Sequence, residues 1–158
     1  MSGQDVVVTR VVGAPVARVW DAWTRPEGVM RWWGATGFTA PLAEMDVRVG
    51  GTSHVCMRSP DGHDLHNLWT YQVVEPEERL EYTLEFCDAS GSVVRPGDLG
   101  LPADVPVPVR HLVTLTPRGE GGTQMSVTEY GYTSEATYRM SRLGLEQCLD
   151  KMAASLRP

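Results

Sequence analysis

The stretch "SEATYRMSRLGLEQCLDKMAASL", Ser134 to Leu156, decides the fold because it predicts the chain's only long amphipathic helix. No proline interrupts it, Ser134 is a favourable N-cap, and Glu135 places a negative charge in the first turn. About 22 helical residues would extend roughly 33 Å. One side of this helix is a broad apolar stripe, made of Tyr138, Ser141, Leu145, Cys148, Leu149, Met152 and Leu156.

Most of the remaining chain predicts strands, of which "LEYTLEF", Leu80 to Phe86, is the clearest. Apolar side chains alternate there with Glu81, Thr83 and Glu85, so one face is buried and the other meets water. Short turns join successive strands, which makes their pairing largely antiparallel. The other strands are expected at residues 5–12, 38–49, 52–58, 68–74, 109–117 and 123–132.

Two short helices are expected after the first strand. In residues 16–24, Val16, Val19 and Trp23 share one helix face, and Pro26 is suited to open a second helical turn. A curved antiparallel sheet with one face to cover, and one long helix to cover it, predict an α+β helix-grip fold in which the sheet wraps around the C-terminal helix. Residues 1–158 are expected to form a single domain, with a pocket between sheet and helix.

Composition excludes several classes of function. The formal net charge is −6 and lysine and arginine do not cluster, so nucleic acid is not an expected partner. No apolar run is long enough for a membrane span and the N-terminus lacks a signal-peptide pattern, so the expected location is the cytoplasm. Cys56, Cys87 and Cys148 lack zinc-type spacing, and with no cofactor motif present, no cofactor is expected.

Residues 88–108 differ in composition from the rest of the chain. They contain four prolines and three glycines, which argues against a regular element. A loop of this length inside a compact domain is uncommon and is usually functional or mobile. This loop and the segment "RWWGATGF", Arg31 to Phe38, are expected to border the mouth of the pocket.

Four motifs resemble those of one family. They are "APVARVWDAWTRPEGVMRWWG" (residues 14–34), "DVRVGGTSHVCMRSPDG" (46–62), "WTYQVVEPEERLEYT" (69–83) and "SRLGLEQCLDKM" (141–152). Together they are similar to the family named after the activator of the heat-shock-protein-90 ATPase, in the START-like, helix-grip (SRPBCC) superfamily. The resemblance implies a cytosolic, bacterial-type protein with an internal apolar cavity and no obligatory cofactor. Its relatives include carriers of lipids or hormones, polyketide cyclases and co-chaperone domains, so it implies no single activity.

Several positions depart from the family's usual pattern. Ser53 stands where an aromatic residue is usual, Trp69 where glycine is frequent, and Leu145 where tryptophan commonly follows glycine. Glu77 occupies a position that is often a second proline. The three changes at positions 53, 69 and 145 predict a cavity with a shape of its own.

His111 and Glu129 are the most suggestive polar residues. Strand alternation places both on the inward face, and their strands are neighbours in a hairpin, so the two side chains are expected to lie close together. A carboxylate beside a histidine suits a general base. The same pair would equally orient a polar group of a ligand, or satisfy itself as buried structure. These three roles remain open at the level of sequence.

Histidines near the turn "SPDG" do not predict a metal site. His63, Asp64 and His66 are assigned to a solvated turn, because alternation sends residues 63 and 66 to opposite faces. His54 is expected to face outward. In the last helix, Gly144 costs about 1 kcal/mol relative to alanine, so the close approach of a strand or ligand is expected to offset it.

The adjacent tryptophans Trp32 and Trp33 are expected to have different roles. Neighbouring residues of a helical turn point about 100° apart. Trp33 falls on the face of Val29, which predicts an anchor in the core, whereas Trp32 is expected at the rim of the cavity. The full set of candidate ligand-binding residues, for each of which core packing is the alternative, is Trp32, Trp33, Ser53, Val55, Met57, Trp69, Tyr71, Tyr82, Leu84, Phe86, Val113, Met125, Val127, Met140 and Gly144.

The leading functional hypothesis is binding of a small hydrophobic, aromatic molecule in the cavity, with His111 and Glu129 as polar contacts. The alternatives are a cyclase-like acid/base enzyme that uses the same cavity, and a co-chaperone-type module that binds a chaperone. Sequence does not decide whether the chain is an enzyme. It leaves the ligand's identity and the oligomeric state open, a homodimer included.

Overall fold

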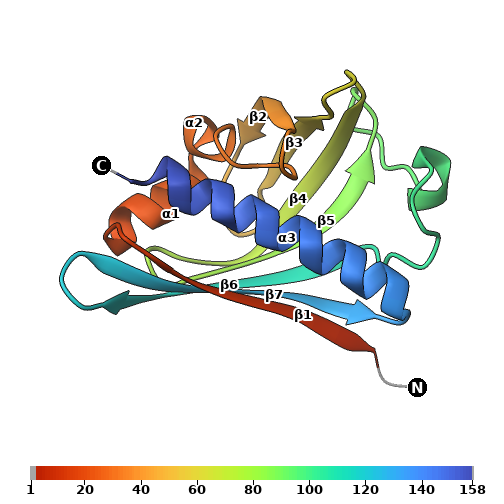
Figure 1. Cartoon of the computed structure of the whole chain (residues 1–158). Coiled ribbons are helices and arrows are strands. Elements are labelled where there is room, and N and C mark those ends of the chain that lie inside the picture. The colour runs from red at the N-terminus through yellow and green to blue at the C-terminus, as the bar shows by residue number, and fades with distance from the viewer. Residues whose placement is uncertain (1–2, 158) are drawn as a thin grey trace.

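Strands paired in one sheet and a long C-terminal helix form the framework of the chain (Figure 1). The computed structural model describes residues 3–157. The elements are β1 (Gln4–Val12), α1 (Val16–Thr24), α2 (Pro26–Val29), β2 (Thr39–Met45), β3 (Thr52–Arg58), β4 (Asp64–Glu75), β5 (Arg79–Cys87), the 3-10 helix η1 (Pro96–Leu99), β6 (Val109–Arg118), β7 (Gly122–Tyr132) and α3 (Glu135–Ser155).

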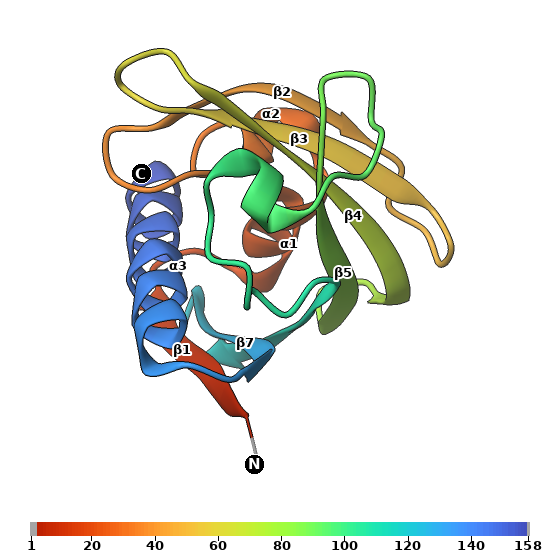
Figure 2. The same ribbon diagram turned by 90° about the vertical axis from the view of Figure 1, so that its right-hand side faces the viewer.

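The sheet is antiparallel throughout and its seven strands follow the order β1-β7-β6-β5-β4-β3-β2. Strands β2 to β7 follow one another in the sheet as in the sequence, joined by short turns except for the loop 88–108 between β5 and β6, and only β1 joins from the far end, beside β7. The sheet curves around α3, as the two views show (Figures 1 and 2). The predicted α+β helix-grip fold is confirmed.

Helix α3 begins and packs as its sequence predicts. The hydroxyl of Ser134 accepts a hydrogen bond from the backbone N–H of Thr137 at 3.2 Å, which caps the first turn. Leu145, Leu149 and Met152 from the apolar stripe are buried against the sheet. Full burial of each such side chain contributes about 1.5–3 kcal/mol, so the helix is held by its stripe rather than by helix propensity.

Helices α1 and α2 lie at one end of the curved sheet, and the loop that carries η1 lies at the other (Figure 1). The end at α1 is solid. The ring of Trp23 packs edge-on against Trp32, with 4.6 Å between ring centroids, and its indole N–H points to the sulfur of Met125 at 3.2 Å. The indole N–H of Trp32 donates to the carbonyl of Ala22 at 2.8 Å, which ties the segment after α2 to α1.

Three local features differ from expectation. Strand β4 begins at Asp64 rather than at residue 68, so it pairs with β3 right up to the "SPDG" turn. A single 3-10 turn interrupts the long loop at Pro96–Leu99. Strand β7 contains a bulge where Tyr132 pairs with Gln4 and Glu129 pairs with Val6. Within residues 3–157, no helix combines the length and apolarity that crossing a membrane requires.

Candidate functional site

A cavity of about 200 Å³ lies between α3 and the concave face of the sheet. Strands β3 to β7 supply its floor, α3 its roof, and residues after α2 one wall. Leu101 and Val105, from the loop that carries η1, complete it at the end away from α1. Figure 2 shows this loop crossing the space between α3 and the sheet.

The structure brings eight of the sequence-predicted site residues together around this cavity. They come from five strands or helices and the segment after α2, and they include both members of the polar pair. They are Trp33, Met57, Leu84, Phe86, His111, Glu129, Met140 and Gly144.

Nine other candidates do not line the cavity. All nine are buried, but they lie in the solid core. Ser53 donates to or accepts from the hydroxyl of Tyr71 at 2.7 Å, and Trp69 stacks on Tyr82 with 4.6 Å between centroids. Alternation fixes the face of a residue but not its place along the strand, and α1 with its tryptophans fills that end. The nine are Trp32, Ser53, Val55, Trp69, Tyr71, Tyr82, Val113, Met125 and Val127.

The expected roles of the two adjacent tryptophans are reversed. Trp32 is fully buried and hydrogen-bonded to Ala22, whereas Trp33 lines the cavity and packs edge-on against Trp69 at 5.0 Å. The helical turn continues past the end of α2, since the N–H of Trp33 donates to the carbonyl of Val29 at 3.0 Å, and the contact of Trp32 with α1 decides which ring enters the core. Trp32 is therefore the anchor and Trp33 the wall.

His111 and Glu129 are directly opposite each other on β6 and β7, and their side chains meet as predicted. Nε2 of His111 lies 2.8 Å from Oε2 of Glu129, and Nδ1 lies 3.0 Å from the carbonyl oxygen of Val109. The imidazole also stacks on the ring of Tyr82, with 4.5 Å between centroids. The hydroxyl of Tyr132 donates to Oε1 of Glu129 at 3.2 Å.

These contacts fix how the pair holds its protons. A carbonyl oxygen only accepts, so Nδ1 of His111 must carry a hydrogen. Nε2 and the Glu129 carboxyl are within hydrogen-bond distance of each other. Both imidazole nitrogens are engaged. Glu129 keeps free lone pairs and lines the cavity, so its carboxyl remains able to accept a hydrogen bond there.

Two further polar atoms at the cavity have no partner among residues 3–157. They are Oδ1 of Asn67 and Nε1 of Trp33, both on buried side chains that line the cavity. A buried polar group left without a hydrogen bond costs about 1–3 kcal/mol. Nε1 of Trp69, in the solid core, is a third buried atom without a partner among the described residues.

Ten of the lining residues were not among the named ligand-binding candidates. Ala35, Leu101 and Val105 lie in the two segments that were expected to border the mouth. Asn67 shares parity with Trp69, but the strand was expected to start after it. Tyr132 points inward because the β7 bulge, with Gly131 at φ +94°, shifts the alternation by one residue. Leu145 and Cys148 belong to the predicted apolar stripe without being assigned to the site. The ten are Ala35, Leu65, Asn67, Leu101, Val105, Val109, Tyr132, Ser141, Leu145 and Cys148.

Burial dominates the electrostatics of the cavity wall. It raises the pKa of the Cys148 thiol to about 11, from an ordinary value of 9.0. Burial also raises the pKa of Tyr132, and the nearby charge of Glu129 acts in the same direction. Both groups are therefore neutral at physiological pH. They present weak donors rather than charges to the cavity.

Helix α3 holds the loop after α2 against the cavity. Nζ of Lys151 donates to the carbonyls of Gly34 at 3.2 Å and Phe38 at 3.0 Å, with a longer contact to Ala35 at 3.4 Å. Oε1 of Gln147 accepts from the backbone N–H of Thr36 at 3.1 Å. This clamp fixes the wall to which Trp33 belongs.

Comparison with known proteins gives a family. The sequence model of the family described as "Activator of Hsp90 ATPase homolog 1-like protein" matches residues 13–157. No curated protein matches the chain.

Solved structures agree with this match. A protein of Chromobacterium violaceum is 27% identical, with 98% of this chain and 97% of that one covered and a TM-score of 0.77. A protein of Arthrobacter aurescens is 26% identical, with 96% and 85% covered and a TM-score of 0.79. The AHSA1 protein of Silicibacter pomeroyi is 15% identical over 97% of each chain, with a TM-score of 0.77, and at that identity the likeness shows the fold alone.

Proposed function

Because the chain belongs to the family of activator of Hsp90 ATPase homolog 1-like proteins, whose fold supports a ligand-binding or chaperone-associated module, we propose that it binds a small hydrophobic molecule. The ligand would lie in the cavity between α3 and the sheet. It would carry at least one hydrogen-bond donor.

One observation carries this proposal. Asn67 lines the cavity with a side chain that is 1% exposed, and its buried Oδ1 has no hydrogen-bond partner among the described residues. The carboxyl of Glu129 is a second acceptor at the same cavity. A hydroxyl or N–H on a bound ligand would satisfy Asn67 and recover the free energy that its burial costs.

The size of the cavity limits the ligand. An apolar cavity of about 150 Å³ in another protein accepts benzene, and drug-sized ligands need about 300–1,000 Å³. A cavity of about 200 Å³ therefore suits one ring with a few substituents. The walls contributed by Trp33 and Phe86 favour an aromatic ring, since aromatic side chains pack edge-on or offset against such a ring.

The geometry argues against His111 as a general base and leaves Glu129 as the member of the pair with free lone pairs at the cavity. A general base needs a free lone pair aimed at the substrate. Nε2 of His111 is engaged by Glu129, and Nδ1 carries a hydrogen donated to Val109. The pair is arranged to orient and to accept. The family's name refers to a chaperone, and association with a chaperone is the second candidate.

Two fluorinated probes test the proposal. We expect 4-fluorophenol, followed by ¹⁹F NMR, to bind more tightly than fluorobenzene, which has the ring but no donor. The preference for 4-fluorophenol should be at most about tenfold in affinity, since a net hydrogen bond contributes about 0.5–1.5 kcal/mol. Asn67→Leu should abolish this preference. It should also raise the free energy of unfolding, because it removes a buried polar atom that lacks a partner.

The matched control is Gln72→Leu, which changes an exposed residue on the same strand and should leave both probes unaffected. Native mass spectrometry of protein purified from its own host would show a retained ligand directly. If neither probe binds and no mass is retained, the cavity is not a binding site. A chaperone co-purifying in place of a small molecule would favour the second candidate.

A further inference from the structure

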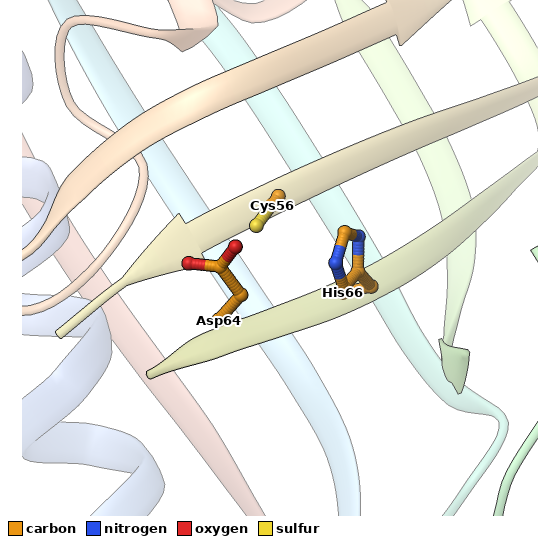
Figure 3. Close-up of side chains that lie close together, drawn as sticks. All are labelled: Cys56, Asp64 and His66. Atoms are coloured by element: carbon orange, nitrogen blue, oxygen red, sulfur yellow. The ribbon is translucent and has the colours of Figure 1, made fainter. Parts of the chain in front are cut away.

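The outer face of the sheet carries a cluster of metal-ligating side chains, separate from the cavity. Cys56 projects from β3, and Asp64 and His66 project from β4 (Figure 3). Cys56 is paired directly with His66, and Asp64 lies two residues before His66, on the same face. The thiol sulfur, a carboxylate oxygen and an imidazole nitrogen all lie within 4.8 Å of one another.

This donor set has the chemistry of a borderline cation such as Zn²⁺. Zinc binds thiolate sulfur at about 2.3 Å and imidazole nitrogen or carboxylate oxygen at about 2.0–2.2 Å, which places tetrahedral donors roughly 3.5 Å apart. The three donor atoms therefore need to converge by about 1 Å, which side-chain rotations supply while β3 and β4 remain paired. Magnesium and calcium prefer oxygen alone, so the thiol and the imidazole select against them.

His54 gives the cluster the support that metal-bound histidines have. Its Nε2 lies 2.9 Å from Nδ1 of His66. With Nδ1 engaged, Nε2 of His66 is the nitrogen left for an ion. A ligating imidazole nearly always donates its other N–H to a neighbour, which fixes the ring's orientation. His54 thus acts as a positioning residue, and it is half-buried on the same face.

Asp64 has a competitor for its carboxylate. Nε and Nη2 of Arg58 donate to its two oxygens at 2.7 and 3.0 Å. The Arg58 side chain is 48% exposed, so its guanidinium can turn into water when a cation takes its place. The guanidinium supplies, in the absence of an ion, the positive charge that the ion would bring.

We propose that Cys56, Asp64 and His66 bind a zinc-class divalent cation, with water in the fourth position and His54 orienting His66. The ion would link β3 to β4 beside the "SPDG" turn. This revises the expectation from sequence that the region holds no metal. That expectation considered neighbours along the chain, whereas the thiol ligand comes from the adjacent strand, and β4 begins early enough to place Asp64 beside it.

Cobalt substitution tests the proposal. The full chain, with any affinity tag removed and its thiols reduced, is titrated with Co²⁺ and separately with Zn²⁺. We expect one equivalent to bind, with a sulfur-to-cobalt charge-transfer band in the near ultraviolet, and Zn²⁺ to displace it. Cys56→Ser should abolish the band, and Asp64→Asn and His66→Asn should each weaken binding at least tenfold.

Matched variants separate ligands from neighbours. Cys87→Ser changes a buried thiol outside the donor set, and His63→Asn changes an exposed histidine of the turn; both should retain the band and the affinity. Arg58→Ala should tighten binding, because it removes the competitor for Asp64. His54→Gln should keep the band but lower the affinity about tenfold or more.

Two results would overturn the proposal. One is the absence of a charge-transfer band in the wild-type chain at saturating Co²⁺. The other is a band that survives in Cys56→Ser or is lost in Cys87→Ser. Circular dichroism of each variant, compared with wild type, shows whether the variant is folded, so that a lost band can be assigned to a lost ligand. Asp64→Asn, at a partly exposed site, tests the site without replacing the buried thiol.

Discussion

Gly144 offers the sharpest separation of stability from function. It lies in the middle of α3 and lines the cavity, and a Cβ built at this position meets no atom within 4 Å. Glycine in a helix interior costs about 0.8–1.0 kcal/mol relative to alanine. Gly144→Ala should therefore raise the free energy of unfolding by about that amount, or the Tm by roughly 2–4 °C for a chain of this size.

A larger side chain at the same position should exclude the ligand. In Gly144→Leu, the side chain would enter the cavity of about 200 Å³, where each buried methylene contributes about 0.8 kcal/mol. We expect this variant to be at least as stable as Gly144→Ala and to lose binding of 4-fluorophenol. Ala154→Leu, on an exposed position of the same helix, is the matched control and should bind normally.

Thermal unfolding and ¹⁹F NMR measure the two effects on the same samples. A fall in Tm for Gly144→Ala would show that the space beside Gly144 is already filled, and the cavity would then not extend to α3. Undiminished probe binding by Gly144→Leu would place the ligand elsewhere. If Gly144→Leu gains stability and loses probe binding, the probe binds in the cavity beside Gly144.

Three further outcomes follow from the structure. Trp32→Ala should lower the free energy of unfolding by about 3–5 kcal/mol, as measured by chemical denaturation. Trp33→Ala should lower it less but change probe binding more, as measured by ¹⁹F NMR. Equal losses of stability in the two variants would contradict the reversed roles. Burial raises the folded-state pKa of Cys148 to about 11 from 9.0. The stability that the neutral thiol contributes is therefore complete below about pH 9, and up to about 3 kcal/mol of it is lost as the pH rises through about 11. Urea titrations should show this alkaline loss of stability, and the loss should be smaller in Cys148→Ala. Lys151→Met removes the donor to the carbonyls after α2 and should cost about 1–2 kcal/mol, with faster amide exchange confined to residues 34–38 if the clamp acts locally.

Period-2 alternation predicted the faces of the strands correctly. The contact between His111 and Glu129 follows from it, since a hairpin places inward residues of adjacent strands opposite each other. Alternation does not predict where along a strand the interior is hollow. That depends on α1, whose Trp23 packs against Trp32 and Tyr82 and fills one end. Tyr82, which alternation places on the inward face, and Trp69, which stacks on it, therefore both lie at the filled end.

Breaks in periodicity explain the other misplacements. The β7 bulge turns Tyr132 inward. The only residue in "EYGY" that indicates the bulge is Gly131, because the bulge requires a positive φ at that position. The helical turn extends to Trp33, whose N–H donates to the carbonyl of Val29, but the helical period does not predict which of its faces meets the cavity. Contacts between distant segments, such as Trp32 with Ala22, then decide the orientation, and sequence spacing does not encode them.

Asn67 and Gly144 both line the cavity, and each carries a stability cost. Gly144 weakens a helix whose other interior positions favour it, and Asn67 leaves a buried acceptor without a partner among residues 3–157. Both residues line the same cavity, on opposite walls formed by α3 and β4. Costs of about 1 kcal/mol and about 1–3 kcal/mol would be removed by single substitutions to alanine and leucine. Under the proposed function a ligand would offset both costs, because it would fill the space beside Gly144 and give Asn67 a hydrogen-bond partner.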